Sequence, residues 1–272
     1  MKKYSAYPYI VWSIIFIIFP LILVVGFSFT KYDEGLIFTL DNFKRLMNPI
    51  YVKVFVRSIN LALISTLVCL IMGYPMAMIL ASTEIKKRNI MVLLFIIPMW
   101  MNFLLRTYAW MSILGRNGFI NTALRTLGFP TVNLLYNDGA VILGMVYNFL
   151  PFMVLPIYTV LSKMDKSLIE AAGDLGANRV TTFRKIILPL SMPGVMSGIT
   201  MVFMPAVSTF VISRLLGGGQ YMLIGNLVEQ QFTVVNDWHF GSAVSILMMI
   251  LILIFMAIMS RYDKEESGGH LW

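Results

Sequence analysis

The feature that most constrains this chain is a series of long apolar runs separated by short polar segments. The runs lie at about residues 9–29, 58–81, 90–114, 140–161, 190–212 and 242–260. A helix rises about 1.5 Å per residue, so about 20 apolar residues span the hydrocarbon core of a bilayer, which is about 30 Å thick. The runs therefore predict an all-α integral membrane protein with six transmembrane helices in a single domain, residues 1–272.

Composition agrees with a chain embedded in lipid. Only 12% of the residues are charged, whereas soluble domains carry about 25%. The formal net charge of +8 does not indicate a nucleic-acid partner, because the basic residues lie between the apolar runs and not on one polar domain. The first run exceeds the apolar region of a secretory signal, about 7–15 residues, and no A-x-A-like site follows it. We therefore expect an uncleaved first helix.

The basic residues also predict the orientation of the spans. An even number of spans places both termini on one side of the membrane. That side holds twelve of the 21 Lys and Arg residues, against eight on the other side and Arg106 inside the third run. Basic residues accumulate in cytoplasmic loops, so we expect cytoplasmic termini and a cytoplasmic segment 163–189.

Patterns typical of catalysis and metal binding are missing from the sequence. The one cysteine, Cys69, lies in an apolar run, which excludes an intrachain disulfide and predicts a small core residue. No G-x-x-x-x-G-K-[ST], H-E-x-x-H or G-x-S-x-G motif occurs. We expect no enzymatic activity, metal or cofactor in this chain, and we place His239 in an outer loop.

Segment 163–189 is a polar and amphipathic interruption between the fourth and fifth runs. Ser167 and Glu170 have the spacing of a capping box at a helix N-terminus. Gly176 is placed to end that helix in a left-handed conformation. A second amphipathic stretch follows, and Pro189 is expected to end it before the fifth span. On the residues alone, an ordinary interfacial loop with a chance capping box explains the segment equally well.

The spacing within this segment resembles the EAA loop of ABC-importer permeases. Its matching positions are Glu170, Ala171, Ala172, Gly173, Gly176, Phe183, Leu188 and Pro189, with Pro193 and Gly194 beyond them. The resemblance implies the type I (MetI-like) permease fold, a bacterial cytoplasmic membrane location and a loop that docks on a separate ATPase. It further implies two copies of that ATPase, which would bind ATP and Mg²⁺, a second homologous permease, and an extracytoplasmic binding protein.

Further stretches resemble the spermidine/putrescine branch of these permeases. They are Arg106-Thr107-Tyr108-Ala109-Trp110, Leu215–Gly219, Ile224–Leu227, Asp237–Ala243, and Tyr32–Leu36 with Thr39–Phe43. This resemblance implies polyamine import by alternating access. Three alternatives stay open: an ABC importer of another cation or organic solute, a secondary transporter, and a structural membrane subunit. The secondary transporter is disfavoured because apart from Arg106 the spans carry no ionisable relay.

A polyamine path would need polar or aromatic groups, since cation–π contacts contribute about 0.5–2 kcal/mol each. The candidates are Trp100, Asn102, Tyr108, Trp110, Tyr147, Asn148, Ser208 and Asp237. For the aromatic residues the alternative is an interfacial belt or helix packing. For Asn102, Asn148 and Ser208 it is hydrogen bonding between helices. Arg106 is expected to be structural or gating; if it lies near the outer end of its span, it can either snorkel to the interface or pair with an acidic residue such as Asp138 or Asp237.

Overall fold

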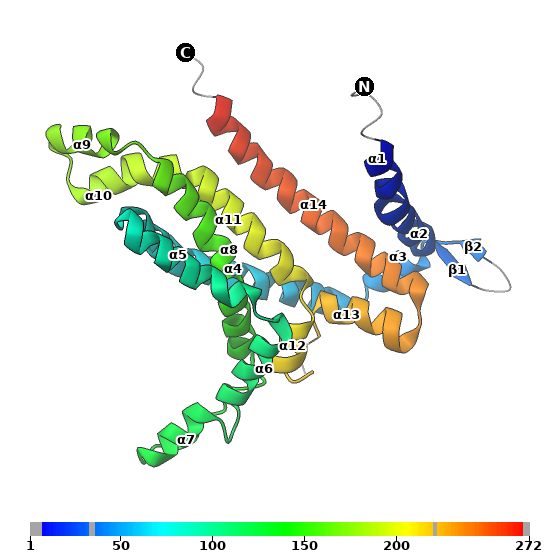
Figure 1. Cartoon of the computed structure of the whole chain (residues 1–272). Helices are drawn as coiled ribbons and strands as arrows, with labels where there is room; N and C mark the ends of the chain where they lie inside the picture. Colours follow the sequence, from blue (N-terminus) through cyan, green and yellow to red (C-terminus); the bar gives the residue numbers. More distant parts are fainter. Residues whose placement is uncertain (1–6, 33–35, 220–221, 269–272) are drawn as a thin grey trace.

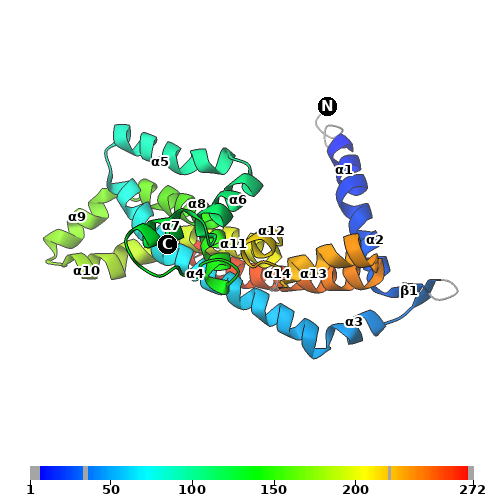
Figure 2. The same ribbon diagram turned by 90° about the horizontal axis from the view of Figure 1, so that it is seen from below.

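The computed structural model describes residues 7–32, 36–219 and 222–268. Its N-terminal part is a helical rod followed by a hairpin and a short helix: α1 (Tyr7–Ser13), η1 (Ile14–Ile18), α2 (Phe19–Ser28), β1 (Thr30–Tyr32), β2 (Leu36–Phe38) and α3 (Asp41–Leu46). The rod stands apart from the bundle except where α2 contacts α14 (Figures 1 and 2). In the antiparallel hairpin Thr30 is opposite Phe38, a departure from the purely helical expectation. The Asp33-Glu34-Gly35 part of the early motif lies outside the described residues.

Three long helices form the centre of the bundle: α4 (Pro49–Ser82), α8 (Asp138–Lys163) and α11 (Leu188–Ser208). Small residues let them approach closely, as is typical of membrane helices. Cys69 is fully buried among them, which confirms it as a small core residue. A Cβ atom on Gly73 would lie only 3.0 Å from Cγ of Met153.

The third apolar run is broken. It forms α5 (Ile85–Trp100) and α6 (Phe103–Leu114), which continues to α7 (Phe119–Thr126), and the axis bends by 92° between the first two helices. Asn102 causes a new helix to start, because its Oδ1 accepts from the backbone N–H of Leu104 at 2.8 Å. The described residues thus contain five helices long and apolar enough to cross a membrane, or six if this bent pair is counted as one span.

The remaining elements lie between and after the central helices: α9 (Lys166–Asp174), α10 (Arg179–Thr182), η2 (Phe183–Ile187), α12 (Val211–Leu216), α13 (Ile224–Gln230), η3 (Gln231–Val235) and α14 (Trp238–Gly268). His239 lies in the first turn of α14, so its expected place in a loop was wrong. Its ring lies 3.1 Å from Oγ1 of Thr30, which joins α14 to the hairpin.

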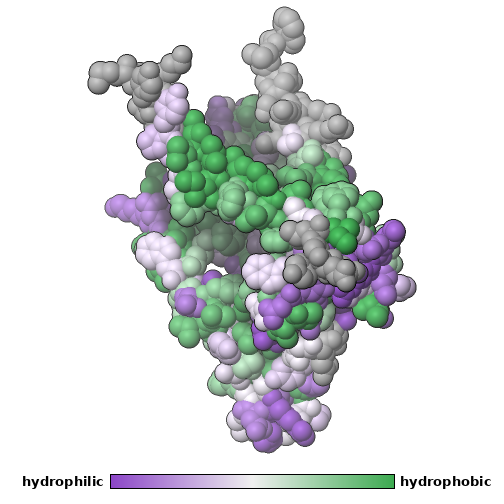
Figure 3. All heavy atoms as spheres, turned by 90° about the vertical axis from the view of Figure 1, so that its right-hand side faces the viewer, coloured by the Kyte–Doolittle hydropathy of each residue, from purple (hydrophilic) through white to green (hydrophobic). Residues whose placement is uncertain are grey.

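The two ends of the molecule differ in character. One end carries α9, α10, the start of α1 and the end of α14, and the other carries α3, α7, α13 and the hairpin (Figure 1). Three ion pairs join different elements at this second end: Arg57–Asp138, Arg45–Asp237 and Arg214–Glu229. Between the ends, the N-terminal helices present a broad apolar surface (Figure 3). The apolar middle and the helical content confirm the all-α membrane class.

Candidate functional site

The first helix of segment 163–189, α9, is capped by Asp165. Oδ1 of this residue accepts from the backbone N–H of Ser167 at 3.0 Å, and this hydrogen bond lowers the pKa of the Asp165 carboxyl. The predicted capping box was therefore wrong: Ser167 lies inside the first turn, and Asp165 holds the N-cap position, where its carboxylate accepts from a free backbone N–H group. An aspartate two residues before Ser167 was the signal in the sequence.

The C-terminus of α9 confirms the role predicted for Gly176. This glycine has φ +76°, a conformation that L side chains rarely adopt. Its N–H donates to the carbonyl of Gly173, and the N–H of Ala177 donates to the carbonyl of Ala172, both at 2.9 Å. These two bonds form a Schellman motif, which ends the helix and turns the chain sharply toward α10.

The second stretch continues into the fifth span without a stop. Oδ1 of Asn178 caps α10 through the N–H of Thr181 at 2.8 Å, and α10, η2 and α11 follow one another directly. The expectation that Pro189 ends this helix was wrong. The N–H of Leu188 bonds to the carbonyl of Phe183, five residues back, so a π-turn accommodates the proline ring and its missing donor.

Aromatic and glycine contacts fix this segment to the bundle. The ring of Phe183 meets that of Tyr74 on α4 edge-on, with centroids 5.7 Å apart, and the Tyr74 hydroxyl lies 2.7 Å from Oγ of Ser191. Further along α11, Gly194 and Gly198 lie against α8, where an added Cβ would meet Ile157 at 3.0 Å and Met153 at 2.8 Å respectively. These contacts connect the segment directly to α4 and α8. Sequence reasoning missed Tyr74 and Ser191.

The outer face of α9 and α10 has no covering in the described chain. Its apolar members are Leu168, Ile169, Leu175 and Val180, with exposed fractions of 44%, 39%, 89% and 64%. Glu170, Ala171 and Gly173 are exposed beside them, whereas Ala172 is buried. Within the described residues, no hydrogen bond or ion pair engages the Glu170 carboxylate. This "open face", as we call it, has the mixture of apolar groups and free charge that suits a protein partner.

The predicted path residues do not form one cluster. Trp100 is 79% exposed at the end of α5 and Tyr108 is 46% exposed on α6. Asn102 serves as a helix cap. Trp110 and Tyr147 do meet, edge to face, with centroids 5.3 Å apart. Tyr147 also borders a cavity of about 330 Å³ whose other lining residues are Met91, Leu94, Phe95, Pro98, Leu150 and Pro151.

Two polar candidates lie within helices. Asn148 is buried, and its Nδ2 donates to the carbonyl of Gly144 at 2.8 Å while its Oδ1 has no partner. Ser208 donates to the carbonyl of Met204 at 3.1 Å, in its own helix. The described contacts of both side chains are thus local, so the structure gives no bond from either to another helix.

Neither Asp237 nor Asp138 forms an ion pair with Arg106 in the described structure, because each aspartate pairs with another arginine. Asp237 binds Arg45 at 2.8 Å and borders a polar cavity of about 720 Å³, while Asp138 binds Arg57. The expected pairing of Arg106 with either aspartate was therefore wrong. Arg106 is 8% exposed and its Nε lacks a partner in the described chain.

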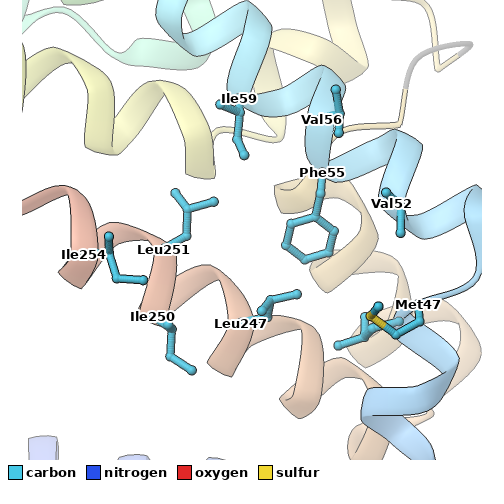
Figure 4. Close-up of a pocket in the computed structure, with 10 residues that line it drawn as sticks. Met47, Val52, Phe55, Val56, Ile59, Leu247, Ile250, Leu251 and Ile254 are labelled. Carbon is cyan, nitrogen blue, oxygen red and sulfur yellow. The ribbon is translucent and has the colours of Figure 1, made fainter.

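A groove between α4 and α14 does not suit a polycation. It has a volume of about 370 Å³ and is lined by apolar side chains only: Leu46, Met47, Val52, Phe55, Val56, Ile59, Leu247, Ile250, Leu251 and Ile254. Phe55 points from α4 into the space facing α14 (Figure 4). Apart from the Phe55 ring, its lining side chains offer no polar or aromatic group that could compensate an ammonium charge.

Comparison with known proteins extends these observations. Residues 73–265 match the family model "Binding-protein-dependent transport system inner membrane component". The spermidine/putrescine transport system permease protein PotB of Escherichia coli K12 is 41% identical over 93% of this chain and 94% of its own length. PotB of Haemophilus influenzae is 38% identical, over 93% and 91%.

The arrangement of helices is shared with a solved transporter. A bacterial alginate ABC transporter, solved in complex with an alginate pentasaccharide-bound periplasmic protein, aligns with a TM-score of 0.80 at 17% identity, covering 95% of this chain and 92% of that one. This likeness confirms the predicted ABC-importer permease fold.

Proposed function

This chain belongs to the family of binding-protein-dependent transport system inner membrane components, and from that premise we propose that it forms half of the pore of an ATP-driven polyamine importer. Spermidine and putrescine are the proposed cargo. The observation that supports these polyamines as the cargo is the 41% identity to PotB, which extends over 93% of the chain. Because the similarity covers nearly the whole chain, it extends beyond segment 163–189 to the spans and outer loops.

The open face of α9 and α10 supports a separate ATPase as the motor. This chain has no phosphate-binding loop of its own, so ATP and Mg²⁺ would bind in that partner. One permease offers one such face, so a second, homologous permease and two ATPase copies complete the machine. The alginate transporter is a precedent for a periplasmic protein bound to such an assembly, and we propose an extracytoplasmic polyamine-binding protein for this one.

The proposed orientation puts α9, α10 and both termini in the cytoplasm of a bacterium. Twelve basic residues lie on that side against eight on the other, in the sense of the positive-inside rule. The arrangement of the described helices supports this, because the start of α1 and the end of α14 lie at the same end as α9 and α10 (Figure 1).

The mechanism we propose is alternating access driven from the cytoplasmic side. ATP binding would close the ATPase dimer and shift α9, and the Schellman turn at Gly176 would carry the shift into α10. From there the contact between Phe183 and Tyr74 and the close packing of Gly194 would move α4 and α8 together. Each ATPase state must bind the open face differently for the equilibrium between the pore states to shift.

The path for the cargo is the least defined part of the proposal. No described span carries a carboxylate in its interior, so a polyamine would rely on aromatic faces and carbonyl or amide oxygens. Trp110, Tyr147 and the unpartnered Oδ1 of Asn148 are the best-supported of the candidates, because the rings meet and the amide oxygen is free. Importers of other cations are the alternative.

Uptake by the assembled importer in liposomes tests both parts of the proposal. Labelled spermidine should enter with ATP and continue after an uncoupler collapses the proton gradient. Uptake that stops with the uncoupler and ignores ATP would instead indicate a secondary transporter. Unlabelled putrescine should compete with labelled spermidine for uptake. If only unrelated cations competed, the assignment of polyamines as the cargo would be overturned, whereas the assignment of an ATP-driven importer would stand.

A further inference from the structure

A second surface without a covering lies at the end of the molecule opposite α9 and α10. It is carried by residues 115–136, which we call the outer arm, between α6 and α8. The arm contains α7 and extends away from the bundle at the bottom of Figure 1. Neither the coupling role nor the proposed cargo path uses it.

The helix of the outer arm is amphipathic. Side chains advance by about 100° per residue, which places apolar residues on one side: Phe119, Ile120, Ala123, Leu124 and Leu127. Polar residues occupy the other side: Asn121, Thr122, Arg125 and Thr126. Such a pattern is typical of helices that lie in the plane of a membrane surface.

Hydrogen bonds of Asn121 fix the arm with part of its apolar side outward. This residue is completely buried. Its Nδ2 donates to the carbonyls of Gly115 and Val132, each at 3.0 Å, and its Oδ1 accepts from the N–H of Val132 at 2.9 Å. With the polar side held in this way, Phe119 stays 77% exposed and Leu127 stays 72% exposed.

The charge of the outer arm is of one sign. It contains Arg116 and Arg125 and no aspartate or glutamate. Both arginines are exposed, and among the described ion pairs neither takes part, whereas Arg45, Arg57 and Arg214 at the same end are all paired. Free guanidinium groups beside exposed aromatic and aliphatic side chains match a surface of phosphates over acyl chains.

The position of α7 along the chain keeps it at the height of the lipid headgroups. Only four residues separate Leu114, the last residue of α6, from Phe119, the first of α7. Four residues reach at most about 14 Å even when fully extended. The arm therefore emerges from the span directly into the interfacial layer and cannot reach far above it.

We propose that the outer arm is a membrane anchor that inserts Phe119, Leu127 and the 60% exposed Phe129 into the outer leaflet and binds anionic phospholipid through Arg116 and Arg125. It would hold the junction of α6 and α8 at a fixed depth while the cytoplasmic end moves. The anchor does not depend on what the importer carries.

Spin labels on two sides of α7 test the proposal in the assembled importer. Leu127→Cys and Thr122→Cys lie about 140° apart around the helix axis, both exposed, and native Cys69 is buried. The importer is reconstituted in nanodiscs containing phosphatidylglycerol or only phosphatidylcholine. The label's accessibility to oxygen, which enriches in lipid, is compared with its accessibility to a water-soluble nickel chelate. Retained uptake shows that each variant is assembled.

We expect a higher oxygen-to-nickel ratio at residue 127 than at residue 122, and a larger difference with phosphatidylglycerol. The double variant Arg116→Gln/Arg125→Gln should lose that lipid dependence. Equal, water-like ratios at both sites would overturn the anchor, and so would protection of residue 127 from both reagents, which would indicate a protein partner. Equal ratios in the two lipids would overturn the binding of anionic phospholipid.

Discussion

Replacing Gly176 by alanine should uncouple the permease from its motor through backbone strain alone. Gly176 has φ +76°, and no atom lies within 4 Å of the position a Cβ would take, so an added methyl group meets no steric obstacle in this chain. A left-handed conformation costs an L residue such as alanine about 1–2 kcal/mol. That free energy lowers the ratio of the Schellman-ended conformation of α9 to its alternatives roughly 5- to 30-fold. ATP-driven uptake in liposomes should fall, by at most this factor, with unchanged amounts of permease in the membrane.

Two matched substitutions separate the effect of backbone strain at residue 176 from the effect of adding a side chain. Asparagine tolerates the left-handed conformation, so Gly176→Asn should keep most of the uptake. Gly26→Ala adds the same methyl group to α2, outside segment 163–189, where no atom lies within 4 Å and the backbone is helical, so uptake should stay near that of the unchanged protein. Wild-type uptake by Gly176→Ala would refute the reasoning. So would an equal loss in Gly176→Asn, because the added side chain and not the backbone angle would then matter.

Glu170→Lys should abolish ATP-driven uptake without changing the amount of protein in the membrane, because it reverses the exposed charge of the open face. Uptake assays and immunoblots of membranes measure these two quantities, and normal uptake would contradict the docking role. Gly194→Leu should force α11 from α8, since a Cβ already meets the carbonyl oxygen of Pro156 at 2.9 Å. Overpacking of this kind costs about 1–3 kcal/mol, or a melting temperature lower by about 2–12 °C in a detergent melt. Gly26→Leu, at a position with no atom within 4 Å, is the control and should melt normally.

The sequence predicted the features that have one physical solution. A run of about 20 apolar residues can only be satisfied in lipid by a helix, and the six runs all became helical. Gly176 was predictable because few residues other than glycine favour the turn that ends α9. Cys69 was predictable as a core residue since it was a small side chain in an apolar run.

The predicted helix ends were wrong where more than one nearby residue could begin or end a helix. Asp165 and Ser167 both suit an N-cap, and only the three-dimensional course of the chain selects Asp165. Pro189 was predicted to end a helix, but a π-turn just before it lets the helix continue. The sequence did not predict the 92° bend within the third apolar run, after which Asn102 starts a new helix.

Contacts between residues far apart in the chain also could not be predicted from the sequence. Arg106, Asp138 and Asp237 were plausible partners by charge, but Arg57 and Arg45 take the two aspartates. Nothing in the chain order indicates which arginine comes nearest. The same holds for the contact of Phe183 with Tyr74, residues 109 positions apart.

Photo-cross-linking from the open face is the most direct test of the coupling role of segment 163–189. Leu175→Cys, at an 89% exposed position, is labelled with a benzophenone maleimide in the assembled importer, with Thr122→Cys on the outer arm as the matched control. Illumination should join the permease to the ATPase subunit from residue 175 and not from residue 122. An active importer that gives no ATPase adduct from residue 175, or that gives one from residue 122, would contradict the assignment of the cytoplasmic docking surface.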